Sequence, residues 1–183
     1  MSTTFPRSRK SRLGYRVDQV EDFLEEARRA YTAAADQPNV LDAGNIRTMA
    51  FAMEKGGYST THVDAALERL EDAFASRERE RVVASEGDAA WYARARSSGQ
   101  TILDRLARES AHKFTRVGPF TSGYHPADVD VFAERMVGYF QHGKTLSVDQ
   151  VRTVVFRTAK RGYNEQQVDL LLDSVIDVML AVR

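Results

Sequence analysis

The sequence contains no cysteine, which removes disulfides, thiolate nucleophiles and cysteine zinc ligands together. It has no net charge either, because 26 Lys and Arg residues balance 26 Asp and Glu residues. No overall field therefore attracts nucleic acid or an acidic membrane. A local basic patch is compatible with this balance.

The sequence also lacks a long apolar run. No stretch approaches the roughly 20 apolar residues of a membrane-spanning helix. The basic, Ser-rich start at residues 1–12 is followed by no apolar segment, so we expect no secretion signal and a cytoplasmic location. At 183 residues and 43% hydrophobic, the chain can build one large domain or two small ones with real cores.

A fourfold repeat is the most informative feature of the sequence. Each copy has a Gly-Tyr pair and a Val five residues after the Tyr. The first and third copies share a Phe ten residues before the Tyr and another eight after it, whereas the second and fourth share a Phe seven before it. This ABAB order predicts a duplicated pair. The repeat residues are Gly14, Tyr15, Val20, Gly57, Tyr58, Val63, Gly123, Tyr124, Val129, Gly162, Tyr163 and Val168.

The repeat motif fits the start of a helix. If the cap directly follows the Tyr, the Tyr and the Val take the two positions that pack together in a hydrophobic staple. Ser59 and Asn164 are good caps, Gln167 can return a hydrogen bond to its cap, and Pro126 suits the first helical position. Arg16 is a poor cap, so we expect the first helix to fray or to begin slightly later. The Gly is expected to supply a turn conformation.

Each Val opens a stripe of apolar residues at spacings of three and four, which is typical of helices packed against other helices. No segment shows sustained strand alternation. We therefore predict an all-α fold, in which tandem repeats form amphipathic helices packed as helical pairs or a short coiled-coil bundle. The predicted organisation is a first repeat pair over 1–80 (repeats near 5–35 and 43–80), a connecting amphipathic helix over 81–110, and a second pair over 111–183 (repeats near 114–142 and 147–183).

Two arrangements of each helix pair follow from the connection lengths. A helix over residues 17–34 is about 27 Å long, and the stretch 35–45 can run back about 33 Å when extended. That return lays the two helices parallel and brings Val20 near Val63. An antiparallel hairpin, which short loops favour, would bring Val20 near Phe74 instead. The connection lengths leave both arrangements open.

The segment Arg161 to Asp169, RGYNEQQVD, resembles the signature of the DivIVA domain of Gram-positive bacteria. Val151 to Phe156 is similar to the short helix and Phe that precede it there. With four copies, the chain resembles actinobacterial proteins with DivIVA repeats, and the resemblance covers most of it outside 78–110. It implies a non-catalytic scaffold that binds the inner membrane face, recruits partners, and takes part in cell division or polar growth. DivIVA domains pair side by side and parallel, so the resemblance favours the parallel arrangement within each repeat pair.

The resemblance also implies an exposed Phe three residues before the repeat Tyr, flanked by bases. Those positions here hold Arg12, Lys55, Thr121 and Lys160, and Leu13 is the candidate apolar replacement. Electrostatics alone contributes about 1 kcal/mol per basic residue near an anionic surface, so we expect weak, salt-sensitive binding. A basic segment of this kind is also typical of a solvated N-terminus. The candidate contacts are Arg7, Arg9, Lys10, Arg12, Leu13, Arg16, Lys55, Lys160 and Arg161.

One segment, Gly138 to Thr145, matches the phosphate-binding P-loop pattern G-x-x-x-x-G-K-[ST]. A P-loop works between a strand and a helix, but this segment follows a helical stripe, and Gly143 fits a helix-ending position. Asp173 mimics a magnesium-binding residue at a strand end but lies within the fourth helical stripe. Nucleotide binding is therefore the less favoured alternative function.

The remaining sequence patterns argue against a catalytic or metal-binding site. The four His residues lack metal-ligand spacing, and there is no nucleophile elbow or isolated carboxylate pair. We expect no enzymatic activity, no cofactor and no metal. No recognition helix or stacking platform accompanies the basic residues, so nucleic acid is not an expected partner. The expected partners are proteins, including a second copy of the chain, and an anionic membrane surface. The alternative is a soluble helical adaptor without a membrane role.

Overall fold

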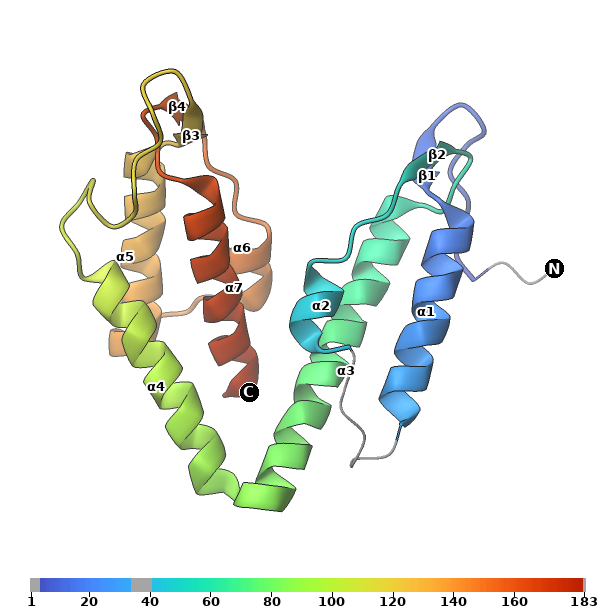
Figure 1. The fold of residues 1–183 in the computed structure, drawn as a ribbon, viewed down its shortest axis with the longest axis horizontal. Helices are drawn as coiled ribbons and strands as arrows, with labels where there is room; N and C mark the ends of the chain where they lie inside the picture. The colour runs from blue at the N-terminus through green and yellow to red at the C-terminus, as the bar shows by residue number, and fades with distance from the viewer. Residues whose placement is uncertain (1–3, 34–40, 183) are drawn as a thin grey trace. The chain divides into compact units, whose positions relative to one another are not determined.

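The structure, a computed structural model, describes residues 4–33 and 41–182. These residues are mostly helical, with seven helices and four strands of three residues each (Figure 1). The chain divides into two compact units, Met1–Ala84 and Ser85–Arg183. No helix in the described part of the chain combines the length and the apolarity that crossing a membrane requires.

After its first helix, the second unit has the same order of elements as the first. Unit 1 contains β1 (Leu13–Tyr15), α1 (Val17–Thr32), α2 (Ala43–Arg47), β2 (Met53–Lys55) and α3 (Thr60–Glu86), whose last residues lie beyond the unit boundary. Unit 2 contains α4 (Asp88–Leu106), β3 (Ser122–Tyr124), α5 (Pro126–His142), α6 (Val148–Arg152), β4 (Thr158–Lys160) and α7 (Glu165–Ala181). Each unit therefore carries one β-α-α-β-α series.

The two long helices of unit 1 run parallel. β1 and β2 pair antiparallel, and each leads into a long helix at the same end of the unit (Figure 1). Val20 and Val63 pack in one core cluster together with Tyr58. Phe74 packs in the other core cluster, with Phe23. The parallel arrangement is therefore confirmed in unit 1, and the antiparallel hairpin is wrong.

Unit 2 repeats this arrangement and adds a further helix. β3 and β4 pair antiparallel, and a bridge joins Tyr124 to Tyr163 directly before α5 and α7 begin. α7 also packs against α6 and α4. Helix α7 consequently buries seven residues on several faces, among them Leu171 and Val178, whereas the longer α3 buries only four. A helix with neighbours on several sides needs apolar residues all round.

The four strands correct the all-α prediction. Each strand has only three residues, too few to produce a visible alternation. Close backbone approach at the motif glycines allows the pairing, because a Cβ on Gly14 would collide with the carbonyl of Tyr58 and one on Gly57 with the carbonyl of Tyr15. None of the four motif glycines has a positive φ. The expected turn role is therefore wrong. These glycines instead allow the two strand-bearing segments of each unit to cross at short distance, and we call this close approach the crossing.

The helix starts agree in part with the predicted caps. The Asn164 side chain accepts a hydrogen bond from the backbone of Gln167, and Pro126 opens α5. Arg16 makes no side-chain cap, yet α1 begins directly after it at Val17. The predicted return bond from Gln167 to its own cap is wrong, because that side chain accepts from the backbone N–H of Thr115 at 3.0 Å.

The third residue of three long helices binds the chain segment that crosses in front of it. Gln19 accepts from the backbone N–H of Ala52, and Asp128 accepts from that of Arg157, as Gln167 does from Thr115. At the start of α3 the crossing residue is Pro6, which has no N–H to donate. There the third residue is His62, whose ring contacts Ser59 instead.

The element boundaries differ from the predicted ones around the connections. The connecting helix expected over 81–110 is α4, which spans Asp88–Leu106 and belongs to unit 2, while α3 continues to Glu86. The first helix ends at Thr32 rather than at residue 34. Residues 34–40, which include part of the predicted return segment, lie outside the described residues.

Candidate functional site

A buried tyrosine fixes the chain crossing in each unit. Tyr58 and Tyr163 are both fully buried. The Tyr58 hydroxyl donates to Glu21 at 2.5 Å, and the Tyr163 hydroxyl donates to Asp130 at 3.0 Å. Burial, followed by the hydrogen bond to Asp130, raises the pKa of Tyr163 to about 12. This phenol therefore stays protonated at neutral pH and acts as a structural donor.

An arginine covers the ring of each buried tyrosine. The guanidinium of Arg7 lies 5.1 Å from the ring centre of Tyr58, and Arg116 lies at the same distance from Tyr163. A cation at this distance is attracted by the ring face. Arg7 also donates to the carbonyl of Gly56 at 3.3 Å. Arg7, a predicted membrane contact, is thus part of the crossing itself.

Arg16 is the second predicted contact that has a partner within the chain. Its guanidinium donates twice to the carboxylate of Asp18, at 2.8 and 2.7 Å. This hydrogen bonding raises the pKa of Arg16 and lowers that of Asp18. The charge of Arg16 is therefore balanced locally, although the pair is exposed.

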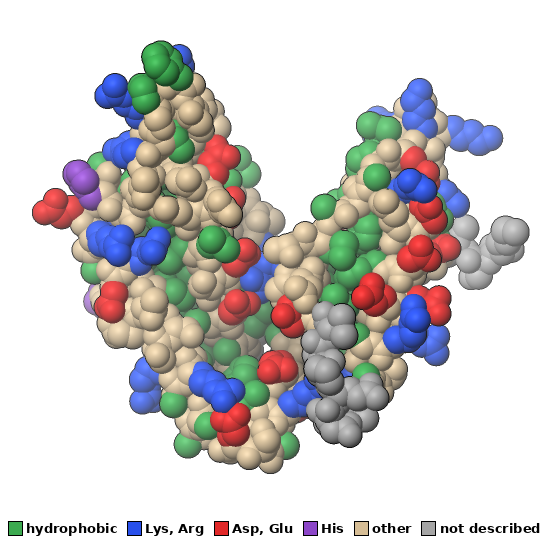
Figure 2. Space-filling model, viewed as in Figure 1, with side chains coloured by type: hydrophobic (Ala, Val, Ile, Leu, Met, Phe, Trp, Pro, Cys, Tyr) green, Lys and Arg blue, Asp and Glu red, His purple; other side chains and the backbone are tan. Residues whose placement is uncertain are grey.

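The strand-bearing end of each unit is called its tip. The tip of unit 1 comprises residues 9–13 and 53–56, and the tip of unit 2 comprises residues 118–122 and 158–161. Each tip consists of two turns, one before the first strand and one after the second. Figure 2 shows basic and hydrophobic side chains together at this end of both units. The two tips differ in which of these dominates.

The tip of unit 1 is basic. A hydrogen bond from the N–H of Arg12 to the carbonyl of Arg9 closes its first turn, at 2.8 Å. Leu13 lies opposite Lys55 in the strand register and is 57% exposed, and Met53 on the same sheet is 48% exposed. The cations on these turns form no ion pair with a carboxylate of the described chain: Arg9, Lys10, Arg12 and Lys55.

The tip of unit 2 presents an aromatic side chain. The N–H of Thr121 donates to the carbonyl of Gly118 at 3.1 Å, which places Phe120 at the corner of the turn. Phe120 is 93% exposed, the largest value among the exposed large hydrophobic side chains of the described residues. The basic residues Lys160 and Arg161 lie on the second turn and are exposed.

Sequence reasoning missed Phe120. The DivIVA resemblance places the exposed aromatic three residues before each repeat Tyr, and the third copy has Thr121 there. Phe120 lies one residue earlier. The adjacent Gly118-Pro119 pair was the available signal, because Gly and Pro mark turns and a residue at the corner of a turn is exposed.

The P-loop match is the C-terminal end of α5. Gly143 has a left-handed φ of 62°, and the N–H of Lys144 donates back to the carbonyl of Gly138 at 3.1 Å, as at helix ends capped by glycine. The Lys144 side chain lies against Gly138. Asp173 lies within α7. This segment therefore lacks the strand-to-helix loop that would surround a phosphate.

Among the described residues, no group of three or more His, Asp or Glu side chains could hold a metal ion. In comparisons with known proteins, no family model, no curated protein and no solved structure matches the chain. The exposed cations and apolar side chains of the tips are the remaining candidate site.

Proposed function

We propose that the chain is a non-catalytic interaction and scaffold protein built from tandem DivIVA-like repeats, which acts at the cytoplasmic face of the membrane in growth or division. The observation that carries this proposal is that exposed cations, which form no ion pair with a carboxylate of the described chain, lie beside exposed apolar side chains at the tips. Anionic lipid headgroups would neutralise the cations, while Leu13 and Phe120 would enter the headgroup layer.

The expected affinity of each tip is low. Four cations at about 1 kcal/mol each give about 4 kcal/mol, which corresponds to a dissociation constant of about 1 mM. Full burial of one Phe side chain adds about 1.5–3 kcal/mol, and this part does not depend on salt. Unit 1 is therefore expected to bind in a salt-sensitive way, and unit 2 to supply a contribution that persists at high salt.

Flotation with liposomes tests this proposal. The chain is expected to float with vesicles containing phosphatidylserine at low salt, to float less at high salt, and not to float with neutral vesicles. The double substitution Arg12→Glu and Lys55→Glu should remove most of the low-salt binding. Phe120→Ser should reduce the salt-resistant part.

Arg96→Glu is the matched control, because Arg96 is an exposed cation on α4 far along the sequence from both tips. It should leave flotation unchanged. A chain that fails to float with anionic vesicles at low salt would contradict the membrane proposal and favour the alternative of a soluble helical adaptor. Septal or polar enrichment of a fluorescent fusion would support the link to division or growth.

A further inference from the structure

Ser11 in the tip of unit 1 occupies the position that Phe120 occupies in the tip of unit 2. Each lies four residues before its repeat Tyr, Tyr15 or Tyr124. Each also directly precedes the residue whose backbone N–H closes the first turn of its tip. Phe120 is 93% exposed at this corner, and Ser11 is exposed as well. The repeat therefore places a hydroxyl in unit 1 where unit 2 has its most exposed aromatic side chain.

The hydroxyl of Ser11 is accessible. Ser11 is exposed, and its hydroxyl forms no hydrogen bond with another residue of the described chain. Ser8, the other serine of the basic segment 7–12, is only half-exposed, and its backbone N–H is bound to the carbonyl of Gly57 at 2.8 Å. Ser11 is therefore the serine of this segment that a modifying enzyme reaches most readily.

The four exposed cations of this tip lie on two turns that are in contact around Ser11. A Cβ on Gly56 in the second turn would lie 3.7 Å from the Cα of Lys10 in the first. The one carboxylate among the tip residues, Glu54, accepts a hydrogen bond from the backbone N–H of Val17 at 3.2 Å and is directed toward the start of α1. A negative group on Ser11 would therefore have several cations beside it.

We propose that Ser11 is a phosphorylation site and that its phosphate releases the tip of unit 1 from anionic membranes. This regulation rests on the membrane binding proposed above. The modifying enzyme is a protein kinase that uses ATP. The Oγ atom of Ser11 attacks the γ-phosphorus and forms a new O–P bond, while the bond from that phosphorus to the β–γ bridging oxygen breaks. ADP leaves, and the hydroxyl proton passes to a base of the kinase.

Bases flank Ser11 on both sides. Arg9 and Lys10 precede it, and Arg12 follows it. Charge patterns of this kind are a general means by which kinases select their substrates, so an enzyme with an acidic peptide-binding site would prefer this segment. A single backbone hydrogen bond, from Arg12 to Arg9, closes the turn, and opening it for an enzyme breaks that bond. The segment thus combines an accessible hydroxyl, neighbouring bases and a backbone that is extended at small cost.

A phosphate on Ser11 would reverse much of the electrostatic attraction of this tip. It carries about −1.5 to −2 elementary charges at pH 7, about half the positive charge of the four cations. If each charge near an anionic surface contributes equally, the loss of two lowers the affinity of this tip about 30-fold. The phosphate would also bind the neighbouring guanidinium groups through charge-assisted hydrogen bonds, which withdraws them from the lipid headgroups.

Flotation of the full chain with phosphoserine incorporated at position 11 tests the regulation. The Phe120→Ser background makes the tip of unit 1 the main contact. In that background, the affinity for phosphatidylserine vesicles at low salt should fall about 30-fold on phosphorylation. Ser11→Glu should bind about fivefold more weakly than Ser11→Gln, which has the same size and no charge. With Phe120 present, the phosphorylated and unmodified chains should bind equally at high salt, because the aromatic contribution does not depend on these charges.

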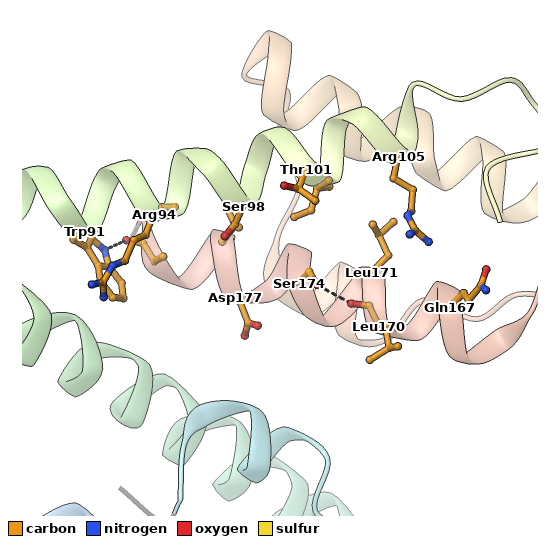
Figure 3. A pocket seen from close by; sticks show the side chains of 14 residues that line it. Trp91, Arg94, Ser98, Thr101, Arg105, Gln167, Leu170, Leu171, Ser174 and Asp177 are labelled. Carbon is orange, nitrogen blue, oxygen red and sulfur yellow. Dashed lines mark hydrogen bonds between the residues drawn. The ribbon is translucent and has the colours of Figure 1, made fainter. Parts of the chain in front are cut away.

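Phosphoserine at position 98 is the matched control. Ser98 is exposed on α4 and lies in the groove of about 640 Å³ between α4 and α7, as Figure 3 shows. It adds the same charge to the same chain at a position far along the sequence from both tips. Its affinity at low salt should therefore stay close to that of the unmodified chain. Circular dichroism melts check that each protein is folded.

The equivalence of Ser11 and Phe120 can be tested without any phosphate. Ser11→Phe places an aromatic side chain at the corner of the basic turn. It should add a salt-resistant part to the binding of unit 1 and raise the affinity by about tenfold or more. No gain at high salt would mean that position 11 does not meet the membrane surface, and the regulation would be wrong.

Mass spectrometry of peptides from the chain, isolated from its native cell, should find phosphate on Ser11. A Ser11 that stays unmodified throughout growth and division would overturn the inference, as would a phosphorylated chain that floats like the unmodified one. In both cases the membrane proposal itself would stand if the unmodified chain binds anionic vesicles. A chain that binds them in neither form would contradict the proposed function and the regulation together.

Discussion

At the scale of single residues, the two units use the same contacts around their buried tyrosines. Phe5 lies edge-on to Tyr58 at 5.5 Å between ring centres, and Phe114 lies edge-on to Tyr163 at 5.3 Å. A carboxylate accepts from each phenol, and an arginine covers each ring. The tyrosine is therefore the packing centre of the crossing rather than only one half of a helix staple.

Removing the ring of Tyr163 should be among the most destabilising single substitutions in unit 2. Tyr163→Ala is expected to lower the free energy of unfolding by about 3–5 kcal/mol, because it leaves a cavity in the core. Tyr163→Phe removes the hydroxyl that donates to Asp130 and accepts from the backbone N–H of Lys113 at 3.3 Å. Asp130 keeps two other donors, but the N–H of Lys113 loses this acceptor, so the change should lower the free energy of unfolding by about 1–3 kcal/mol. Urea denaturation measures both values.

Tyr92→Ala is the control for this pair, since Tyr92 is 42% exposed on α4. Its effect should be small. Equal melting temperatures for the unmodified chain and Tyr163→Ala would be incompatible with the structure, since a fully buried ring cannot be removed without loss of packing.

Asp128 at the start of α5 should titrate at unusually low pH. Hydrogen bonding from the guanidinium of Arg157 lowers the pKa of Asp128 to about 2, from an ordinary value of 3.8. A carboxylate whose pKa is lower in the folded state stabilises the fold above its unfolded-state pKa. That contribution is lost as the pH falls from about 4 toward 2. Carboxyl NMR shifts followed across this range measure the pKa directly.

Arg157→Gln should return the pKa of Asp128 toward its ordinary value. Arg135→Gln, on the same unit but without a bond to Asp128, should leave it low. If Asp128 titrates near 4 in the unmodified chain, the ion pair at 2.6 Å does not persist in solution.

The sequence allowed the residue types at the crossing to be found but not all of their roles. The regular spacing identified Tyr58 and Tyr163 because helix entry imposes a local pattern. The role of Gly14 could not be found in this way, because the backbone that approaches it lies more than 40 residues later in the chain. Gln167 was misassigned for the same reason, since its acceptor role depends on a segment 52 residues away.

At the scale of elements, helices were predictable and strands were not. An apolar stripe of three-and-four spacings marked α1, α3, α5 and α7, because each buries at least one face along several turns. The strands produce no recognisable sequence pattern, because each pair of strands spans only three residues. The length of the connection permitted the parallel direction of α1 and α3, and the resemblance to DivIVA domains favoured it.

The segment at the end of α5 that matches the P-loop pattern is expected to bind no nucleotide. Lys144→Ala should leave the secondary structure unchanged, because Lys144 lies outside the helix and its side chain is exposed. The chain should show no saturable change in Trp fluorescence or heat on titration with ATP and Mg²⁺, because Gly138 to Gly143 form a capped helix end rather than a phosphate loop. Calorimetric titration of both proteins measures this.

Gly143→Ala is the useful companion to that experiment. It should lower the melting temperature, because Ala resists the left-handed φ of 62° that ends α5. Micromolar ATP affinity that disappears in Lys144→Ala would contradict the helix-end interpretation.

At the scale of the whole molecule, the same series of elements occurs in two different settings. Unit 1 has no helix ahead of its first strand in the described chain, whereas α4 in unit 2 covers part of α5 and α7. The sequence reflects this difference. Where α7 has Leu171 and Val178, the matching positions of α3 hold Ala66 and Ala73, which suit a more exposed face. The setting of each copy could therefore not be inferred from the repeat motif alone.

Two units with separate cores should unfold in separable steps. The single Trp lies on α4, so its fluorescence reports on unit 2 only, whereas far-ultraviolet circular dichroism reports on helices of both units. Tyr58→Ala removes a fully buried ring from unit 1. It should shift an early part of the dichroism transition to lower urea and leave the midpoint of the fluorescence transition unchanged.

Tyr163→Ala should have the opposite effect, moving the fluorescence midpoint and leaving the unit 1 part of the dichroism transition in place. The two substitutions are matched controls for each other, because each removes the same side chain from the same position of its crossing. Helix α3 runs through the unit boundary at 84–85 and is the element through which unfolding would pass from one unit to the other. A fluorescence midpoint that falls equally in both variants would mean that α3 transmits unfolding between the units and that the molecule is one cooperative body.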